Sequence, residues 1–284
     1  MKPRYISNLF LGAIIIASFF VFPFVLAKTT TTSSTTIEMQ KSTTSTPIII
    51  ILPHQDDELF MAGAIQQYQK SGRKVHVIMV SDGGSSAVRH ILNGKDDKGN
   101  LAIYASDKKP HNPLKEGYSW FTRQRFSAAR NREFIRSMKE LGIAKSQIEF
   151  MNPGKEFGSA NPIYRDGDLQ KTSAKAIALM YKKYGDGTYV TLSGGHPDHV
   201  ALEDALFEAI GISEKIFFPF KYDTAQDHIT LSEDEMKKKQ KAVDAYGEWK
   251  PREGKFAIGK LSVNGLMDTW RQQVKEYFYS LKIN

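Results

Sequence analysis

The chain has 284 residues, of which 41% are hydrophobic and 25% are charged, enough to bury one large core without covalent staples. It contains no cysteine, which excludes a disulfide framework, a thiolate metal site and a cysteine nucleophile, so any metal must be held by His, Asp or Glu. The formal charge of +8 comes from 39 basic and 31 acidic residues. We interpret it as a moderately basic solvated surface rather than a nucleic-acid interface.

The N-terminus has the pattern of an export signal. Lys2 and Arg4 precede an apolar run over 9–27, so residues 1–27 are predicted to be a signal peptide, or an uncleaved membrane anchor because the run is close to the ~20 residues that span a bilayer. Residues 28–46 are rich in Thr and Ser and predict a flexible linker. The sequence thus predicts an exported protein (secreted, periplasmic or anchored to the outer face of the cytoplasmic membrane) with a folded domain at 47–284.

The folded part opens on an unbroken apolar run, Ile48 to Leu52, between two prolines. Such a run predicts a strand that is buried on both faces. A helix is predicted over 58–71 and a second strand over 74–80, and this order with a short connection implies parallel pairing through a right-handed crossover. The predicted fold class is therefore α/β: a doubly wound, mostly parallel, Rossmann-like sheet with helices on both faces, in a single domain.

The remaining elements continue this alternation. Helices are predicted over 122–141, 169–184, 200–210, 233–246 and 268–281, and strands over 148–151, 188–192 and 215–218, the last of which is expected to end the sheet. Residues 83–121 form a long, mostly aperiodic insertion, which is typical of a lid or a binding loop. The aromatic residues at its end, Tyr118, Trp120 and Phe121, predict either a sugar-stacking platform or an anchor to the core.

Two clusters of histidine and carboxylate side chains follow predicted strands, one after 48–52 and one after 188–192. They comprise His54, Asp56, Asp57, His196 and His199. Because the carboxyl ends of parallel strands meet at one edge of a sheet, these side chains can converge. A lone cluster could be structural, since an aspartate here can simply cap a helix. Recurrence at two equivalent strand ends favours a metal site with three protein ligands and an open position, as in catalytic zinc sites.

The two clusters also carry a family resemblance. Pro53-His-Gln-Asp-Asp-Glu58, paired with His196-Pro-Asp-His199, resembles the signatures of the LmbE-like or PIG-L family of zinc-dependent N-acetylglucosamine deacetylases, over roughly residues 47–246. The resemblance implies that His54, Asp57 and His199 bind Zn2+ or another divalent metal. It also implies that Asp56 is the general base that activates a zinc-bound water, and that His196 stabilises the oxyanion or assists the leaving amine.

Three residues are candidate substrate contacts: Arg130, Trp120 and Asp198. The first resembles the arginine of the family's Arg-x-x-Glu helix, although its i,i+3 spacing from Glu133 also suits an ordinary surface ion pair. Two positions depart from the family pattern. Gln55 replaces a proline, which is expected to leave metal binding intact, and Tyr246-Gly247-Glu248 replaces a late His-Ser-Gln, so no role is carried over there.

The sequence therefore predicts an exported, metal-dependent hydrolase that removes an acetyl group from an N-acetylglucosamine-containing glycan or glycolipid by cutting a linear amide bond. Two alternatives stay open: a metal-dependent amidase acting on a larger acyl or peptidyl amide, and a catalytically silent carbohydrate-binding protein. The expected partner is an N-acetylated sugar, oligosaccharide or glycolipid, with a possible membrane tether through 9–27.

Overall fold

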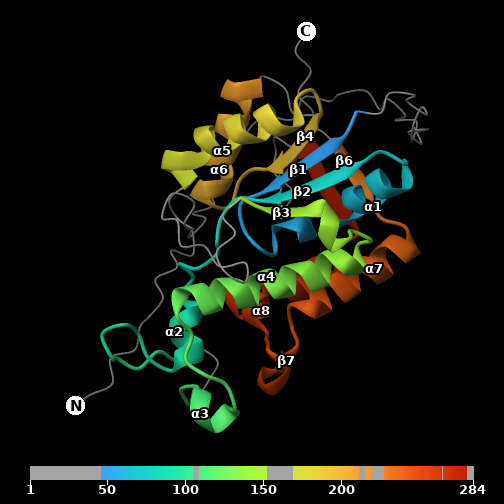
Figure 1. Cartoon of the computed structure of the whole chain (residues 1–284). Helices are drawn as coiled ribbons and strands as arrows, with labels where there is room; N and C mark the ends of the chain where they lie inside the picture. Colours follow the sequence, from blue (N-terminus) through green and yellow to red (C-terminus); the bar gives the residue numbers. More distant parts are fainter. Residues whose placement is uncertain are drawn as a thin grey trace, which may run out of the picture.

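The computed structural model describes residues 46–104, 109–151, 169–210, 215–218, 227–263 and 265–279. The predicted signal segment at 1–27 lies outside these residues, as does nearly all of the predicted linker, so both stay predictions. No helix in the described ranges is long and apolar enough to cross a membrane. A seven-stranded sheet in the order β3-β2-β1-β4-β5-β9-β6 forms the centre of the molecule (Figure 1).

Most of this sheet is parallel. Its parallel strands are β1 (Ile48–Leu52), β2 (Val75–Met79), β3 (Ile148–Phe150), β4 (Thr188–Leu192) and β5 (Lys215–Phe218). The chain runs from β1 through β2 to β3 on one side and continues through β4 to β5 on the other, so the strand order reverses between β1 and β4. Ligands of doubly wound folds bind outside the carboxyl ends of the strands at such a point. The predicted fold class is confirmed.

Helices cover both faces of the sheet (Figure 1). One face packs against α5 (Leu169–Tyr184) and α6 (Pro197–Ile210), and the other against α1 (Ala62–Lys70), α4 (Arg123–Glu140) and α7 (Glu233–Ala245).

Strand β1 shows how the sequence builds these layers. Ile48, Ile50 and Leu52 belong to the core under α4 and α7, whereas Ile49 and Ile51 belong to the core under α5 and α6. All five side chains are fully buried, because successive residues of a strand point to opposite faces and both faces are covered. This confirms the strand predicted from the uninterrupted apolar run.

The long insertion is anchored at its end. It contains α2 (Val88–Asn93) and the short α3 (Pro113–Glu116). Tyr118 and Phe121 are buried in a cluster with Val88 of α2 and Phe126 of α4. These two aromatic residues therefore anchor the insertion to the core. Trp120 is different: it is 39% exposed, and the Lys95 ammonium lies 4.6 Å from its ring centroid.

The C-terminal part differs from the prediction. Strand β5 does not end the sheet, because β9 (Lys275–Tyr279) pairs antiparallel with it and β6 (Asp227–Thr230) pairs antiparallel with β9. The helix predicted over 268–281 is present only in its first part, because α9 (Leu266–Gln272) ends before β9 begins. Within β9, Glu276 and Phe278 are buried while Lys275 is exposed, and this two-residue alternation outweighs the helical pattern that precedes it.

The smaller elements complete the chain. They are β7 (Trp249–Lys250), β8 (Lys255–Phe256), α8 (Ile258–Ser262) and 3-10 helices over Asp57–Met61, Lys145–Gln147 and Pro251–Glu253. Helix α4 matches its prediction, with the Thr122 hydroxyl accepting a hydrogen bond from the Arg125 amide at its start. Helix α6 begins at Pro197, three residues earlier than predicted. Asp198 and His199 therefore lie in its first turn.

Candidate metal centre

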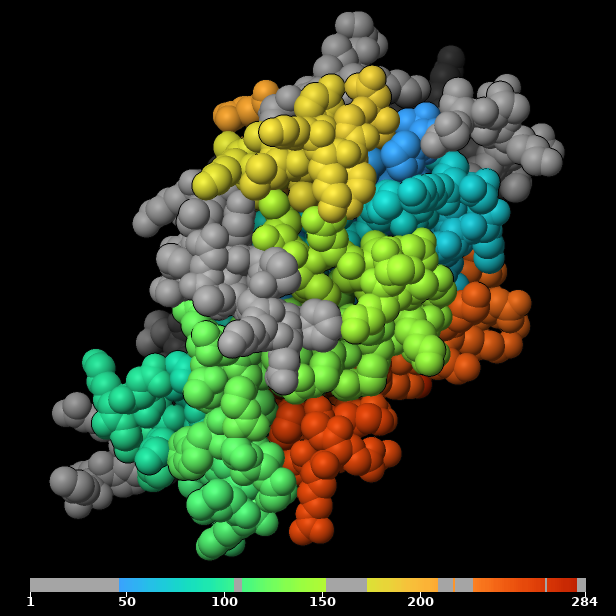
Figure 2. Space-filling view, viewed as in Figure 1, coloured from blue at the N-terminus to red at the C-terminus, as the bar shows by residue number. Residues whose placement is uncertain are grey.

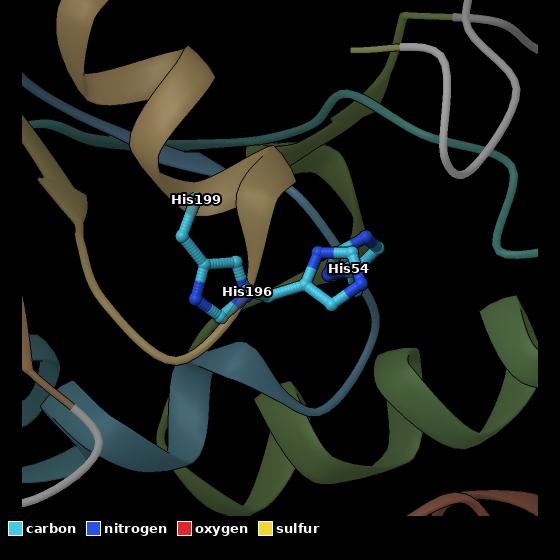
Figure 3. A group of neighbouring side chains, drawn as sticks. All are labelled: His54, His196 and His199. Carbon is cyan, nitrogen blue, oxygen red and sulfur yellow. The ribbon is translucent and has the colours of Figure 1, made fainter. Parts of the chain in front are cut away.

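The two predicted clusters lie together at the carboxyl edge of the sheet. In the pairing of β1 with β4, Ile50 lies opposite Val190, so both strands end at the same level and their following loops run side by side. The ligating atoms of His54, His196 and His199 all lie within 4.8 Å of one another. Figure 3 shows the three imidazoles gathered in one place, with His199 extending from the start of α6. The structure thus shows the convergence that was predicted from the strand ends.

Asp57 lies between two of these imidazoles. Its Oδ2 is 3.4 Å from His54 Nδ1 and its Oδ1 is 3.2 Å from His199 Nε2. The His54 backbone amide also donates a hydrogen bond to Asp57 Oδ2, at 2.8 Å. Burial alone would raise the pKa of Asp57, but the two neighbouring imidazoles hold it well below its ordinary value. Asp57 is therefore an ionised, buried carboxylate with a histidine on either side.

The other nitrogen of each imidazole is held by an acceptor. His199 Nδ1 lies 2.7 Å from the Gly194 carbonyl oxygen, to which it donates, and His54 Nε2 lies 3.1 Å from Asp198 Oδ2. Since a neutral imidazole carries one proton, these contacts assign it to the nitrogen that faces the acceptor. In this neutral form, which is the form that binds a metal, the lone pairs of His54 Nδ1 and His199 Nε2 would face Asp57.

This arrangement fits a divalent cation. Two imidazole nitrogens and a carboxylate face one another, and a bound cation can take the place of the protons between them. Metal bonds of about 2.0–2.2 Å in tetrahedral geometry place ligand atoms roughly 3.3 Å apart, close to the separations of 3.2 and 3.4 Å found here. Carbonyl and carboxylate partners on the outer nitrogens are also usual for metal-binding histidines.

His196 offers a second possibility within the same site. Its ring centroid lies 4.8 Å from that of His54, so its imidazole is also within reach of a shared ion. Its side chain is however 45% exposed, and its Nδ1 accepts a hydrogen bond from the Asp198 backbone amide at 3.1 Å. The remaining nitrogen, Nε2, is therefore the protonated one and can donate to a bound substrate.

The three consecutive carboxyl groups of the first motif lie in different environments. Burial raises the pKa of Asp56 to about 7, against the opposing effect of the Arg130 guanidinium. Burial also raises the pKa of Glu58 to about 8, whereas Asp57 stays ionised. Asp56 has a φ of 103°, a left-handed conformation that is costly for a non-glycine residue and that clusters at functional sites.

Arg130 holds the loop that carries Asp56. Its guanidinium donates to the carbonyl oxygens of Gln55 at 2.8 Å and Gly83 at 3.1 Å, and lies 3.4 Å from Asp56 Oδ2. It is only 4% exposed, so in this structure it ties the loops after β1 and β2 together. Its role as a substrate contact stays a prediction.

The surface ion-pair alternative for Arg130 and Glu133 is wrong. Glu133 is 1% exposed, and its carboxylate accepts hydrogen bonds from the backbone amides of Ile258 and Gly259 at 3.1 and 3.0 Å. The two residues of the Arg-x-x-Glu pattern thus hold different loops onto α4, which is why both are buried.

Three supporting hydrogen bonds were not identified from the sequence. The carboxyl group of Glu58 accepts hydrogen bonds from the hydroxyls of Ser137 and Tyr246, at 2.5 and 2.8 Å. This gives Tyr246, where the late motif departs from the family pattern, a structural role behind the first motif. Gln55 is fully buried and donates to Asn131 Oδ1 at 2.5 Å. For Gln55 and Tyr246 the only sequence signal was the departure from the family pattern.

The structure places the other two predicted substrate contacts differently. Asp198 is 1% exposed, and its carboxylate contacts His54. In this position Asp198 can orient the imidazole of His54 for metal binding. Trp120 is partly exposed beside Lys95, and its role as a sugar contact stays a prediction.

The fold matches solved structures at low sequence identity. A pseudoaglycone deacetylase for an antimicrobial reagent gives a TM-score of 0.52 at 18% identity, covering 84% of this chain and 97% of that chain. The zinc-inhibited form of a teicoplanin deacetylase gives 0.50 at 15%, covering 84% and 100%. A 4-carboxy-2-hydroxymuconate hydratase from Pseudomonas putida gives 0.50 at 15%, covering 84% and 97%. These likenesses show the fold, which does not by itself define a reaction.

A search among curated proteins found no match. A family model described as PIG-L: GlcNAc-PI de-N-acetylase matches residues 49–210, a range that holds both motifs and every candidate ligand. The match covers more than half of the chain and agrees with the resemblance carried by the two motifs. The chain therefore belongs to the PIG-L family of GlcNAc-PI de-N-acetylases.

Proposed function

We propose that the protein is a metal-dependent deacetylase that removes the acetyl group from an N-acetylglucosamine-containing glycan or glycolipid outside the cytoplasm. The observation that carries this proposal is the meeting of the two motif loops, which brings His54, Asp57 and His199 into contact beside Asp56. Family membership supports deacetylation as the reaction, and the donor set supports a metal.

Different residues of the site have different roles in amide hydrolysis. A divalent ion held by His54, Asp57 and His199 would supply Lewis acidity that polarises the amide carbonyl and lowers the pKa of a water. Asp56 takes the proton from the attacking water and later returns it to the departing amine. His196 donates from Nε2 to the oxyanion of the tetrahedral intermediate, since its Nδ1 already accepts from the Asp198 amide.

The test is release of free amine from a panel of N-acyl sugars by the metal-loaded protein. We expect turnover of N-acetylglucosamine derivatives, lost in the Asp56→Asn variant. Cleavage of larger acyl or peptidyl amides with no turnover of acetyl sugars would support an amidase instead. Saturable sugar binding without any amine release would support a carbohydrate-binding protein.

The identity of the metal needs its own measurement. Zn2+ is our proposal because two imidazoles and one carboxylate with an open position suit it. One structural neighbour is however described as a zinc-inhibited form, so activity should be measured after chelation and stepwise return of Zn2+, Mn2+ or Co2+. Restoration by one stoichiometric equivalent of Zn2+ supports zinc, and restoration by another ion alone replaces it.

We place the reaction outside the cytoplasm because of the basic flank, the apolar run at 9–27 and the Thr/Ser-rich stretch after it. Expressed in a bacterial host, the protein should lie beyond the cytoplasmic membrane, either starting at Lys28 or held by the uncleaved segment. Recovery of the full-length chain as a soluble cytoplasmic protein would contradict export.

A further inference from the structure

A pocket with a volume of about 360 Å3 lies against α4, away from the metal centre. Its walls come from the segment that follows α3, from α4 and from the hairpin that joins β7 to β8. Figure 2 shows the first and last of these segments, in green and red-orange, side by side. They approach so closely that a Cβ atom on Gly117 would lie 3.1 Å from Arg252 Cγ. The pocket size is within the usual range for small-molecule sites.

The pocket is strongly basic. Arg125, Arg132 and Arg252 all line it, and none of its lining residues is acidic. The Arg125 guanidinium donates to the Trp120 carbonyl oxygen at 2.7 Å, which fixes its position before any ligand arrives. Arg252 makes no ion pair with another residue in the part of the chain that the structure describes. Positive charge is therefore concentrated in a concave site without a carboxylate in its wall.

The pocket is separate from the metal centre. Arg125 and Arg132 are seven residues apart in α4 and so lie on the same face of the helix. Arg130, which contacts the loop of Asp56, points to the other side. An α-helix is about 10 Å across, so a ligand held by Arg125 and Arg132 does not touch the candidate metal ligands.

We propose that this pocket binds a phosphate group, as a monoester or a diester, independently of the metal centre. Guanidinium groups match phosphate oxygens with paired hydrogen bonds, and three positive charges favour a phosphate over a single carboxylate. The rings of Tyr118, Phe121 and Phe256 in the same wall provide apolar contact for the organic group attached to the phosphate. Two sources carry this chemistry, a lipid headgroup and a soluble or polymer-borne phosphate ester.

The full chain, loaded with metal, should be titrated calorimetrically with glycerol 1-phosphate. We expect saturable binding that Arg252→Ala and Arg132→Ala each weaken about tenfold or more, the usual cost of losing a hydrogen bond to a charged group. Metal content should not change in either variant. The matched control is Arg89→Ala, which removes an arginine paired with the exposed Asp97 and should leave phosphate affinity unchanged.

Two further ligands distinguish the source of the phosphate group and test the proposal of a phosphate site. Tighter binding of a short-chain phosphatidylglycerol, kept below its micelle concentration, would indicate a lipid headgroup, and equal binding would indicate a soluble or polymer-borne phosphate. Acetate binding as tightly as glycerol 1-phosphate would overturn the proposal, as would phosphate binding that ignores both arginine variants, since that binding would belong to the metal. Deacetylase activity is measured separately, so failure here leaves the proposed reaction untouched.

Discussion

The group of His54, Asp57 and His199 and the ion pair of Lys239 with Glu276 are both buried, but they differ in how their polar atoms are satisfied. Glu276 accepts hydrogen bonds from the Gly63 and Ala64 amides and lies 3.2 Å from Lys239 Nζ. A negative charge there meets a positive one, and both side chains are at most 1% exposed. This pair fastens α7 and β9 to the start of α1.

The histidine group combines different atoms. Two imidazole nitrogens face the Asp57 carboxylate, and His196 beside them is exposed. Imidazole nitrogens and carboxylate oxygens brought together in this way are typical of metal sites. Burial of charge alone therefore does not mark a site: the Lys239–Glu276 pair joins one cation to one anion, whereas the histidine group gathers several side chains that could bind a metal. Substitutions in the histidine group are expected to reduce metal binding and turnover, and substitutions in the ion pair to reduce stability.

The largest effect is expected for His199→Ala. Removing one of three ligands should abolish stoichiometric metal binding and lower turnover by more than the ~10²–10⁴-fold worth of a general base, because both the Lewis acid and its water are lost. Elemental analysis and amine release measure the two losses. His228→Ala, on exposed β6, is the control. Full metal content in His199→Ala would remove His199 from the ligand set.

Asp56→Asn should keep both metal and fold while turnover falls by about 10²–10⁴-fold, since the amide cannot accept the proton of the attacking water. Metal content and turnover are measured on the same sample. Loss of metal in this variant, with retention in Asp57→Asn, would exchange the roles assigned to the two aspartates.

Lys239→Met should lower the free energy of unfolding by about 3–5 kcal/mol, because it leaves Glu276 buried beside backbone amides without its cation. Urea unfolding measures this, and the folded fraction should still bind metal. Lys237→Met, which removes an exposed partner of Asp234 in the same helix, should cost less than about 1 kcal/mol. Equal losses in the two variants would mean that the buried pair contributes no more than a surface pair.

Asp198→Asn tests whether this residue orients His54 or contacts substrate. We expect metal affinity to fall about 10–100-fold, the usual effect of removing a partner that orients a metal-binding histidine. Competition with a chelator of known affinity measures it. A raised KM with unchanged metal affinity would restore the substrate contact predicted from the sequence.

The smallest effect is expected for Trp120→Ala. If the exposed indole stacks on a sugar, the ratio of kcat/KM for an N-acetylglucosamine oligosaccharide to that for the monosaccharide should fall about twofold to tenfold, with metal content unchanged. Leu114→Ala, at a residue 77% exposed in α3, is the control. Equal efficiency on both substrates in the unmodified protein would make the insertion a structural cover.

Local patterns in the sequence were sufficient for much of this molecule. The apolar run at 48–52 predicted a strand covered on both faces, and the meeting of the two motifs followed from the parallel order of the strands. Because the carboxyl ends of parallel strands lie at one edge of the sheet, the residues of the two motifs, about 140 positions apart, could be predicted to meet from the sequence alone.

Other features depended on contacts that no local pattern contains. Burial of Arg130, Glu133 and Asp198, and the link from Tyr246 to Glu58, follow from which loops pack against α4 and α6. The same holds for β9, which replaced the second part of a predicted helix because β5 left an open edge that an antiparallel strand could cover. Periodicity reports how a segment buries its own side chains, whereas the partner that satisfies a polar group or a strand edge is decided only when distant segments pack together.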